Sequence, residues 1–178
     1  KKMRTKLVDA AAQKVEAMWK KQDMPKLDEK TEKKGGRVKV GESDSVKAKD
    51  AAYYLQPYAK DETKKMLEGI LSDWLSTDWQ LRNQLGKTNL AQILPRAGSK
   101  GPESAMKWLE ATDEPGRVAG LLRKHGDDEI KEEVDKILVA KAEEQHPKLS
   151  GSLLGAIVTS ETDVVVPYLK KAIQDPKS

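Results

Sequence analysis

The sequence predicts an all-α protein, either a compact multi-helix bundle or a small helical-repeat-like stack of short helices. Three observations favour this fold class. Apolar residues recur at the three- and four-residue spacing of a helix face along most of the chain. Capping residues, glycines and prolines divide these stretches into segments of about 8–18 residues. No alternating strand pattern of comparable length competes with them.

The first expected element is a basic amphipathic helix in residues 1–22. Val8, Val15 and Trp19 fall on its apolar stripe, and its lysines lie mostly away from that stripe. Such a stripe must be buried, and we favour burial on the rest of this chain. The alternative is that Val8, Val15 and Trp19 form a partner-binding helix face.

A charged, glycine-containing linker is expected over residues 23–45, because Pro25 ends the helix and few apolar residues follow it. Its glycines at positions 35, 36 and 41 lack the G-K-[ST] ending of a phosphate-binding loop, so a tether is the better interpretation. Its basic side chains are candidate contacts to an acidic partner or to a phosphate backbone. These are Lys33, Lys34, Arg37 and Lys39.

Residues 46–178 are expected to form one all-α domain. Helices are predicted within 46–58, 61–75, 77–85, 88–94, 102–109, 113–126, 127–147, 149–158 and 162–176. The clearest begins at Asp127 and carries Val134 and Leu138 in its stripe. The helix over 149–158 has Leu153, Leu154, Ile157 and Val158 among its apolar residues. The carboxylates of the chain are expected on the polar faces of these helices.

Charge is distributed unevenly. Residues 1–49 contain 15 Lys and Arg against 8 Asp and Glu, a balance of +7, whereas the remainder contains 18 against 21, a balance of −3. Phosphate neutralisation by Lys and Arg supplies sequence-independent affinity for nucleic acids. The basic segment therefore keeps nucleic acid open as a partner, although its own carboxylates dilute the positive charge.

Catalytic, cofactor and metal sites are not indicated. The chain has no cysteine, which excludes disulfides, thiolate zinc sites and cysteine nucleophiles. His125 and His146 fall at predicted helix ends, where a cation complements the dipole. Ser104 and Lys107 match the S-x-x-K pattern of serine acyl-enzymes, but its supporting motifs are missing.

These observations predict a non-enzymatic helical interaction or structural module that acts within a larger protein assembly, with protein partners and no cofactor. The alternative is a nucleic-acid-associated protein that uses its basic N-terminal segment. No apolar run approaches the ~20 residues that span a bilayer, and no secretory signal pattern is present. We therefore expect no membrane span and a cytoplasmic or other intracellular location.

Overall fold

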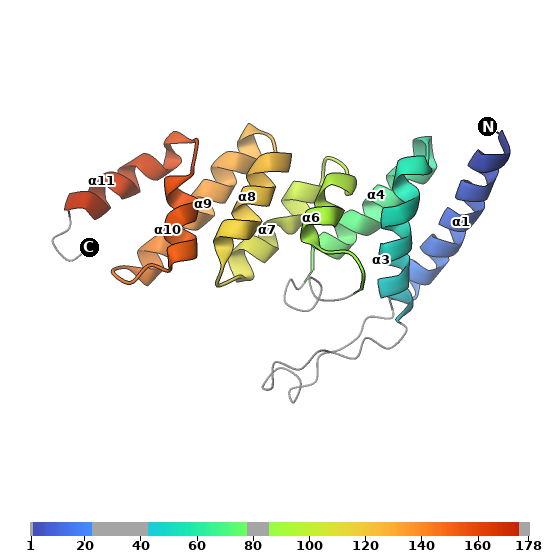
Figure 1. The fold of residues 1–178 in the computed structure, drawn as a ribbon, viewed down its shortest axis with the longest axis horizontal. Coiled ribbons are helices and arrows are strands. Elements are labelled where there is room, and N and C mark those ends of the chain that lie inside the picture. Colours follow the sequence, from blue (N-terminus) through green and yellow to red (C-terminus); the bar gives the residue numbers. More distant parts are fainter. Residues whose placement is uncertain (1, 23–42, 78–85, 175–178) are drawn as a thin grey trace, which may run out of the picture. The chain divides into compact units, whose positions relative to one another are not determined.

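The computed structural model describes residues 2–22, 43–77 and 86–174 (Figure 1). Every regular element within these ranges is a helix, which confirms the predicted all-α class. The chain divides into two compact units, Lys1–Gly101 and Pro102–Ser178, and each is described by itself. None of the helices in the described ranges is long and apolar enough to cross a membrane.

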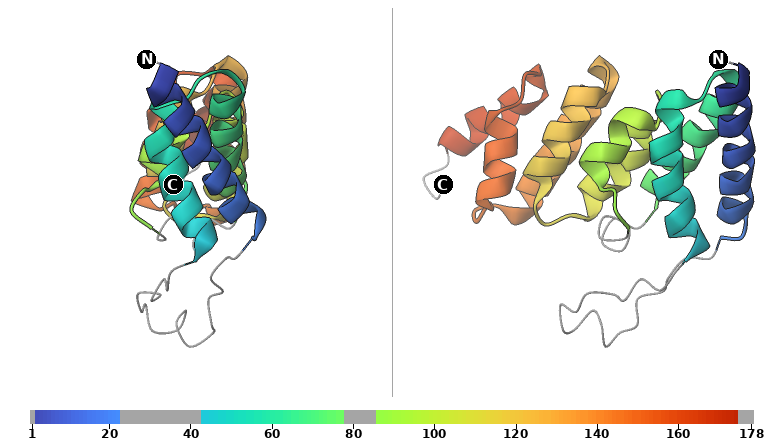
Figure 2. Two further views of the ribbon diagram at one scale, coloured as in Figure 1. Left: turned by 90° about the vertical axis from the view of Figure 1, so that its right-hand side faces the viewer. Right: turned by 45° about the vertical axis from the view of Figure 1, so that its right-hand side comes forward.

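The described residues of the first unit form three long helices and several short ones. Its elements are α1 (Lys2–Lys20), α3 (Asp44–Leu55), the 3-10 helix η1 (Gln56–Tyr58), α4 (Asp61–Leu75), α6 (Leu90–Ile93) and the 3-10 helix η2 (Leu94–Arg96). Helix α1 lies alongside α3 and also contacts α4 (Figure 2). Trp19 of α1 and Trp74 of α4 are both buried, with ring centroids 6.3 Å apart.

The apolar stripe of α1 is covered by the chain itself. Val8, Val15 and Trp19 are all buried in the structure, and α3 and α4 are the helices that pack against α1. The three side chains therefore belong to the core of the first unit and are not open to an external partner. This packing also joins α1 to α3 and α4 in one unit, so the expected separation of residues 1–22 from a domain at 46–178 is not how the contacts divide.

Helix α3 begins earlier than expected, at Asp44. The Oγ atom of Ser43 accepts a hydrogen bond from the backbone N–H of Val46 at 3.5 Å, which makes Ser43 the N-cap. Ser45, the residue before the expected start at position 46, is buried within the helix. The expected linker over most of 23–45 and the expected short helix near Leu81 and Leu85 lie outside the described residues.

Five α-helices are formed by the residues of the second unit that the structure describes. They are α7 (Gly101–Ala111), α8 (Pro115–His125), α9 (Asp128–Gln145), α10 (Gly151–Val158) and α11 (Val166–Gln174), with the 3-10 helix η3 (Asp163–Val165) before α11. Helices α8, α9 and α10 pack against one another. Their shared core contains Leu122, Val134, Leu138, Leu153 and Ile157.

Side-chain caps set the starts of α9 and α10. Oδ1 of Asp127 accepts from the backbone N–H of Ile130 at 3.0 Å, and Oγ of Ser150 accepts from that of Leu153 at 3.2 Å. Each cap satisfies a backbone donor that the first turn of a helix leaves without a partner. The two caps therefore fix where these helices begin, and with them the segment that joins α10 to η3.

Candidate interaction surface

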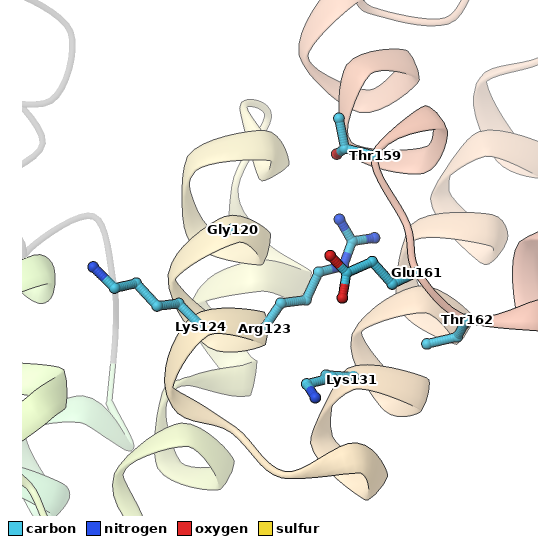
Figure 3. Close-up of a pocket in the computed structure, with 7 residues that line it drawn as sticks. All are labelled: Gly120, Arg123, Lys124, Lys131, Thr159, Glu161 and Thr162. Atoms are coloured by element: carbon cyan, nitrogen blue, oxygen red, sulfur yellow. The ribbon is translucent and has the colours of Figure 1, made fainter.

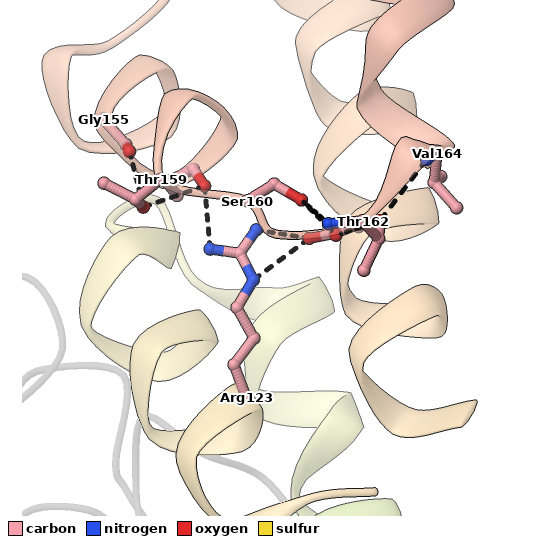
Figure 4. Close-up of polar contacts among 8 residues, drawn as sticks. Arg123, Gly155, Thr159, Ser160, Thr162 and Val164 are labelled. Atoms are coloured by element: carbon pink, nitrogen blue, oxygen red, sulfur yellow. Dashed lines mark hydrogen bonds and ion pairs between the residues drawn. The ribbon is translucent and has the colours of Figure 1, made fainter. Parts of the chain in front are cut away.

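A buried charged network joins three helices of the second unit (Figure 4). Asp135 of α9 is fully buried, and Arg123 of α8 donates to its Oδ1 atom from Nε at 3.0 Å and also from Nη2. Nη1 of Arg123 donates to the backbone carbonyl of Ala156 on α10 at 2.8 Å. The hydroxyls of Ser160 and Thr162 donate to Oδ2 of Asp135. Both carboxylate oxygens are therefore hydrogen-bonded, as a buried charge requires.

The same network holds the segment that follows α10. The backbone N–H of Thr162 donates to Oγ of Ser160 at 3.1 Å, and the Thr162 hydroxyl accepts from the N–H of Val164 at 3.3 Å. The hydroxyl of Thr159 donates back to the carbonyl of Gly155 at 2.9 Å. Hydrogen bonds thus hold this segment to α9, through Asp135, and to the last turn of α10, through Gly155.

A surface pocket of about 450 Å³ lies beside this network (Figure 3). Its lining combines α8, α9 and the segment after α10. The lining residues are Gly120, Arg123, Lys124, Lys131, Thr159, Glu161 and Thr162. Three of them are cationic and one is a carboxylate, and two of the cations are paired with carboxylates outside the lining, Arg123 with Asp135 and Lys131 with Asp128.

The cations of the pocket are held differently. The side chain of Arg123 is only 13% exposed, and its guanidinium is paired with Asp135. Lys124, in contrast, extends away from Glu161 (Figure 3). Lys131 pairs with Asp128 at 2.8 Å. The hydrogen bond to Asp128 raises the pKa of Lys131, and the carboxylate of Glu161 adds to the effect. Lys131 therefore remains protonated.

The α8 side of the pocket carries two cations, Arg123 and Lys124, and the α9 side carries Lys131. Burial, and then the nearby charge of Lys124, lower the pKa of His125, so this imidazole adds little charge near pH 7. A second depression of about 490 Å³ shares Lys131, Glu161 and Thr162 with the first. Three of its other lining residues are acidic, Asp128, Glu132 and Asp163, and the fourth is the apolar Val164. The surface therefore changes sign across Lys131.

One face of α10 is apolar and exposed next to the cationic pocket. Leu154 is 48% exposed and Val158 is 64% exposed, whereas Leu153 and Ile157 are fully buried. A helix turns by about 100° per residue. Positions 154, 158, 151, 155 and 159 therefore follow one another around a single exposed arc, which ends at Thr159 in the pocket wall.

Helix α10 carries no charged side chain, and two of the exposed positions on this arc are Gly151 and Gly155. A Cβ atom added to either glycine would meet nothing within 4 Å. We call this arc together with the cationic pocket the α10 surface. It offers apolar side chains, exposed helix backbone and fixed positive charge within one unit.

The first unit contains a comparable buried cation that does not open onto a pocket. Lys49 of α3 is fully buried, and its Nζ atom donates to the carbonyl and the hydroxyl of Thr88 at 3.0 and 2.8 Å and lies 2.8 Å from Oδ1 of Asp50. It also lies 4.9 Å from the centroid of the Trp74 ring. Burial lowers the pKa of Lys49, and Asp50 opposes that shift.

Sequence reasoning located few of these residues. Lys33, Lys34, Arg37 and Lys39 lie outside the described residues, so their proposed contacts stay predictions. Asp135 was expected on a polar face and is instead buried. The signal was available, because Asp135 lies three residues before Leu138, on the same side of α9 as the core stripe.

Metal and cofactor chemistry finds no support in the described ranges. His125 and His146 fall at the ends of α8 and α9, as the sequence predicted. Within these ranges no three His, Asp or Glu side chains are grouped so that they could hold a metal ion.

A smaller pocket of about 150 Å³ is lined by Tyr168 together with Glu143 and Lys171. The hydroxyl of Tyr168 is buried and lacks a hydrogen-bond partner among the described atoms.

Comparison with known proteins does not assign the chain to a family. No family model, no curated protein and no solved structure matches the chain.

Proposed function

We propose that the chain is a non-enzymatic helical interaction module that acts within a larger protein assembly. The observation that carries the proposal is the exposed apolar arc of α10. Leu154 and Val158 are exposed on a helix without charged side chains, although the buried face of the same helix already supplies Leu153 and Ile157 to the core. The exposed pair is therefore not needed to hold α10 in place.

The size of the arc suits a reversible contact. Burying a Leu or Val side chain fully contributes about 1.5–3 kcal/mol, and association costs several kcal/mol of lost freedom. Two such side chains alone would support only weak binding. Additional polar contacts are required for a stable complex, and the pocket residues next to Thr159 can supply them.

The interaction is tested by site-specific photo-crosslinking in the cells that make the protein. A benzophenone amino acid at position 158 is expected to form discrete adducts with another protein. The matched controls are the same probe at Lys107 and at Glu144, which are exposed polar positions in the same unit. Adduct yields at position 158 that do not exceed those at the two controls would contradict the proposal.

Nucleic-acid association through the basic N-terminal segment is the second candidate. The charge balance of +7 over residues 1–49 favours it, and Arg4, Lys6, Lys14 and Lys20 are exposed on α1. Retention of the protein on immobilised duplex DNA or RNA that falls steeply with salt would support it. A variant with these four residues changed to Gln serves as the comparison. If it is retained on the nucleic acid as strongly as the original chain, α1 has no role in the binding.

A further inference from the structure

We propose that the α10 surface binds an acidic amphipathic segment of a partner protein, with its apolar side chains on Leu154 and Val158 and its carboxylate in the pocket lined by Arg123 and Lys124. This inference rests on the proposed function and names the chemistry of the partner. It commits to a peptide segment because the apolar arc and the charged pocket are adjacent, so one ligand must satisfy both.

Adjacency follows from the geometry of α10. Thr159 is both the last position of the exposed arc and a residue of the pocket wall. The neighbouring edge of α10 packs on α8, because the N–H of Gly116 donates to Oγ of Ser152 and Arg123 donates to the carbonyl of Ala156. Moving around α10 from Val158 through Thr159 therefore leads directly into the pocket beside α8.

The charge of the pocket selects the sign of the ligand. Arg123, Lys124 and Lys131 line the pocket together with a single carboxylate, that of Glu161, and Lys124 extends away from that carboxylate (Figure 3). Arg123 is held in place by the buried Asp135 and by Ala156, so its position does not depend on a ligand. A guanidinium has five N–H donors, and the bonds to these two residues use three of them. An arginine fixed in this way is suited to carboxylate recognition.

The acidic depression beyond Lys131 limits how the segment can lie. A carboxylate placed past Lys131 would meet Asp128, Glu132 and Asp163, which would repel it. The acidic residue of the segment must therefore lie on the side of α8, next to the residues that contact Leu154 and Val158. The inference therefore also predicts where the acidic residue stands in the partner segment relative to the apolar residues.

Selection of peptides from a random display library on the purified full chain tests this inference. We expect enrichment of peptides in which leucine-like residues are followed by Asp or Glu at helical spacing. Affinity for a selected peptide should fall by about tenfold or more in the Lys124→Glu/Lys131→Glu variant and in the Leu154→Ser/Val158→Ser variant. Both pairs are on the surface, and far-UV circular dichroism verifies that each variant folds.

The matched control is Lys107→Glu/Lys170→Glu, which changes the net charge equally at exposed positions that do not line the pocket. It should bind the selected peptides with an affinity within about twofold of the original. Failure to enrich any peptide, enrichment of basic or uncharged peptides, or equal losses in the control and the pocket variant would overturn the inference. If any of these results were obtained together with crosslinked adducts at position 158, the proposed interaction module would be retained and only the acidic partner segment would be rejected.

Discussion

The two units each contain a network of hydrogen bonds built around an ion pair, in different surroundings. In each, a buried charge and a partly buried partner of opposite charge hold a connecting segment against a helix. Buried Lys49 and partly buried Asp50 hold Thr88 in the first unit, and buried Asp135 and partly buried Arg123 hold the segment after α10 in the second. Both networks satisfy their charges with hydroxyls and backbone groups, as buried ions require.

The difference lies in what surrounds the cation. Lys49 is enclosed by the Trp74 ring and by the backbone of Gly86, where an added Cβ would come within 2.6 Å of Nζ. Arg123 is backed by Asp135 on one side and borders an open pocket on the other. An ion pair of this kind serves the fold alone when it is enclosed, and it can also present charge to a ligand when one edge of the cation is left open.

Breaking the second network is expected to have the largest effect. Asp135→Ala leaves the Arg123 guanidinium buried without its carboxylate, which costs about 3–5 kcal/mol. Hydrogen exchange followed by mass spectrometry on peptides from residues 102–174 would measure the loss in that unit. An unchanged exchange pattern would show that the network contributes nothing to the stability of the second unit.

Closing the space at Gly86 is expected to have the next largest effect. Gly86 has a φ of +83°, and a Cβ there would also lie 2.9 Å from Cγ1 of Val46. Gly86→Ala should destabilise the first unit by about 2–3 kcal/mol. The control is Gly155→Ala, which enters open space on α10 and should stabilise it by about 0.5–1 kcal/mol. Urea unfolding measures both, and equal effects would contradict the enclosure of Lys49.

Replacing the enclosed cation tests whether its charge is needed. Lys49→Met keeps most of the side-chain volume and leaves Asp50 with the Lys87 N–H at 2.8 Å and the Thr88 hydroxyl at 2.7 Å. We expect a loss of only about 1–2 kcal/mol in urea unfolding, since apolar replacements of buried ions are well tolerated when the remaining charge is still paired. A loss as large as that of Asp135→Ala would show that the two networks depend on their cations equally.

The smallest effect is expected in the pH dependence of the first unit. Burial alone would raise the pKa of Asp50, but the hydrogen bonds from Lys49, Lys87 and Thr88 outweigh it and hold that pKa below its ordinary value. The unfolded chain therefore binds a proton at higher pH than the folded chain, and stability falls as the pH drops below about 4.

Asp50→Asn should remove this component of the acid sensitivity. Its unfolding free energy, measured by urea titration at several acidic pH values, should fall less steeply with decreasing pH than that of the original chain. Identical slopes for the two proteins would mean that Asp50 does not titrate differently in the folded state.

The sequence was sufficient for the helices because their signals are local. Asp127 and Ser150 cap α9 and α10 at or next to the expected starts, and the stripe of α9 is buried at Val134 and Leu138 as predicted. Caps and stripes depend on residues a few positions apart, so they can be recognised without knowing what the helix packs against.

The candidate site could not be predicted in the same way, because it depends on packing between helices. Leu153 and Leu154 are adjacent and point to different sides of α10, so only the position of α8 and α9 decides which of them is buried. Arg123 and Asp135 are twelve positions apart on different helices, and nothing in their local sequence joins them. Two hints were available, the place of Asp135 on the core side of α9 and the apolar composition of α10.

The central claim is that the second unit provides the interaction surface while the exposed aromatics of the first unit do not. It is tested most directly by the ratio of protein adducts formed by one photo-crosslinking probe placed at position 158 or at position 54. The two positions are similarly exposed, with Val158 at 64% and Tyr54 at 55%. We predict several-fold more adduct at position 158, because Val158 lies on the proposed α10 surface. Equal yields, or a higher yield at position 54, would contradict the account.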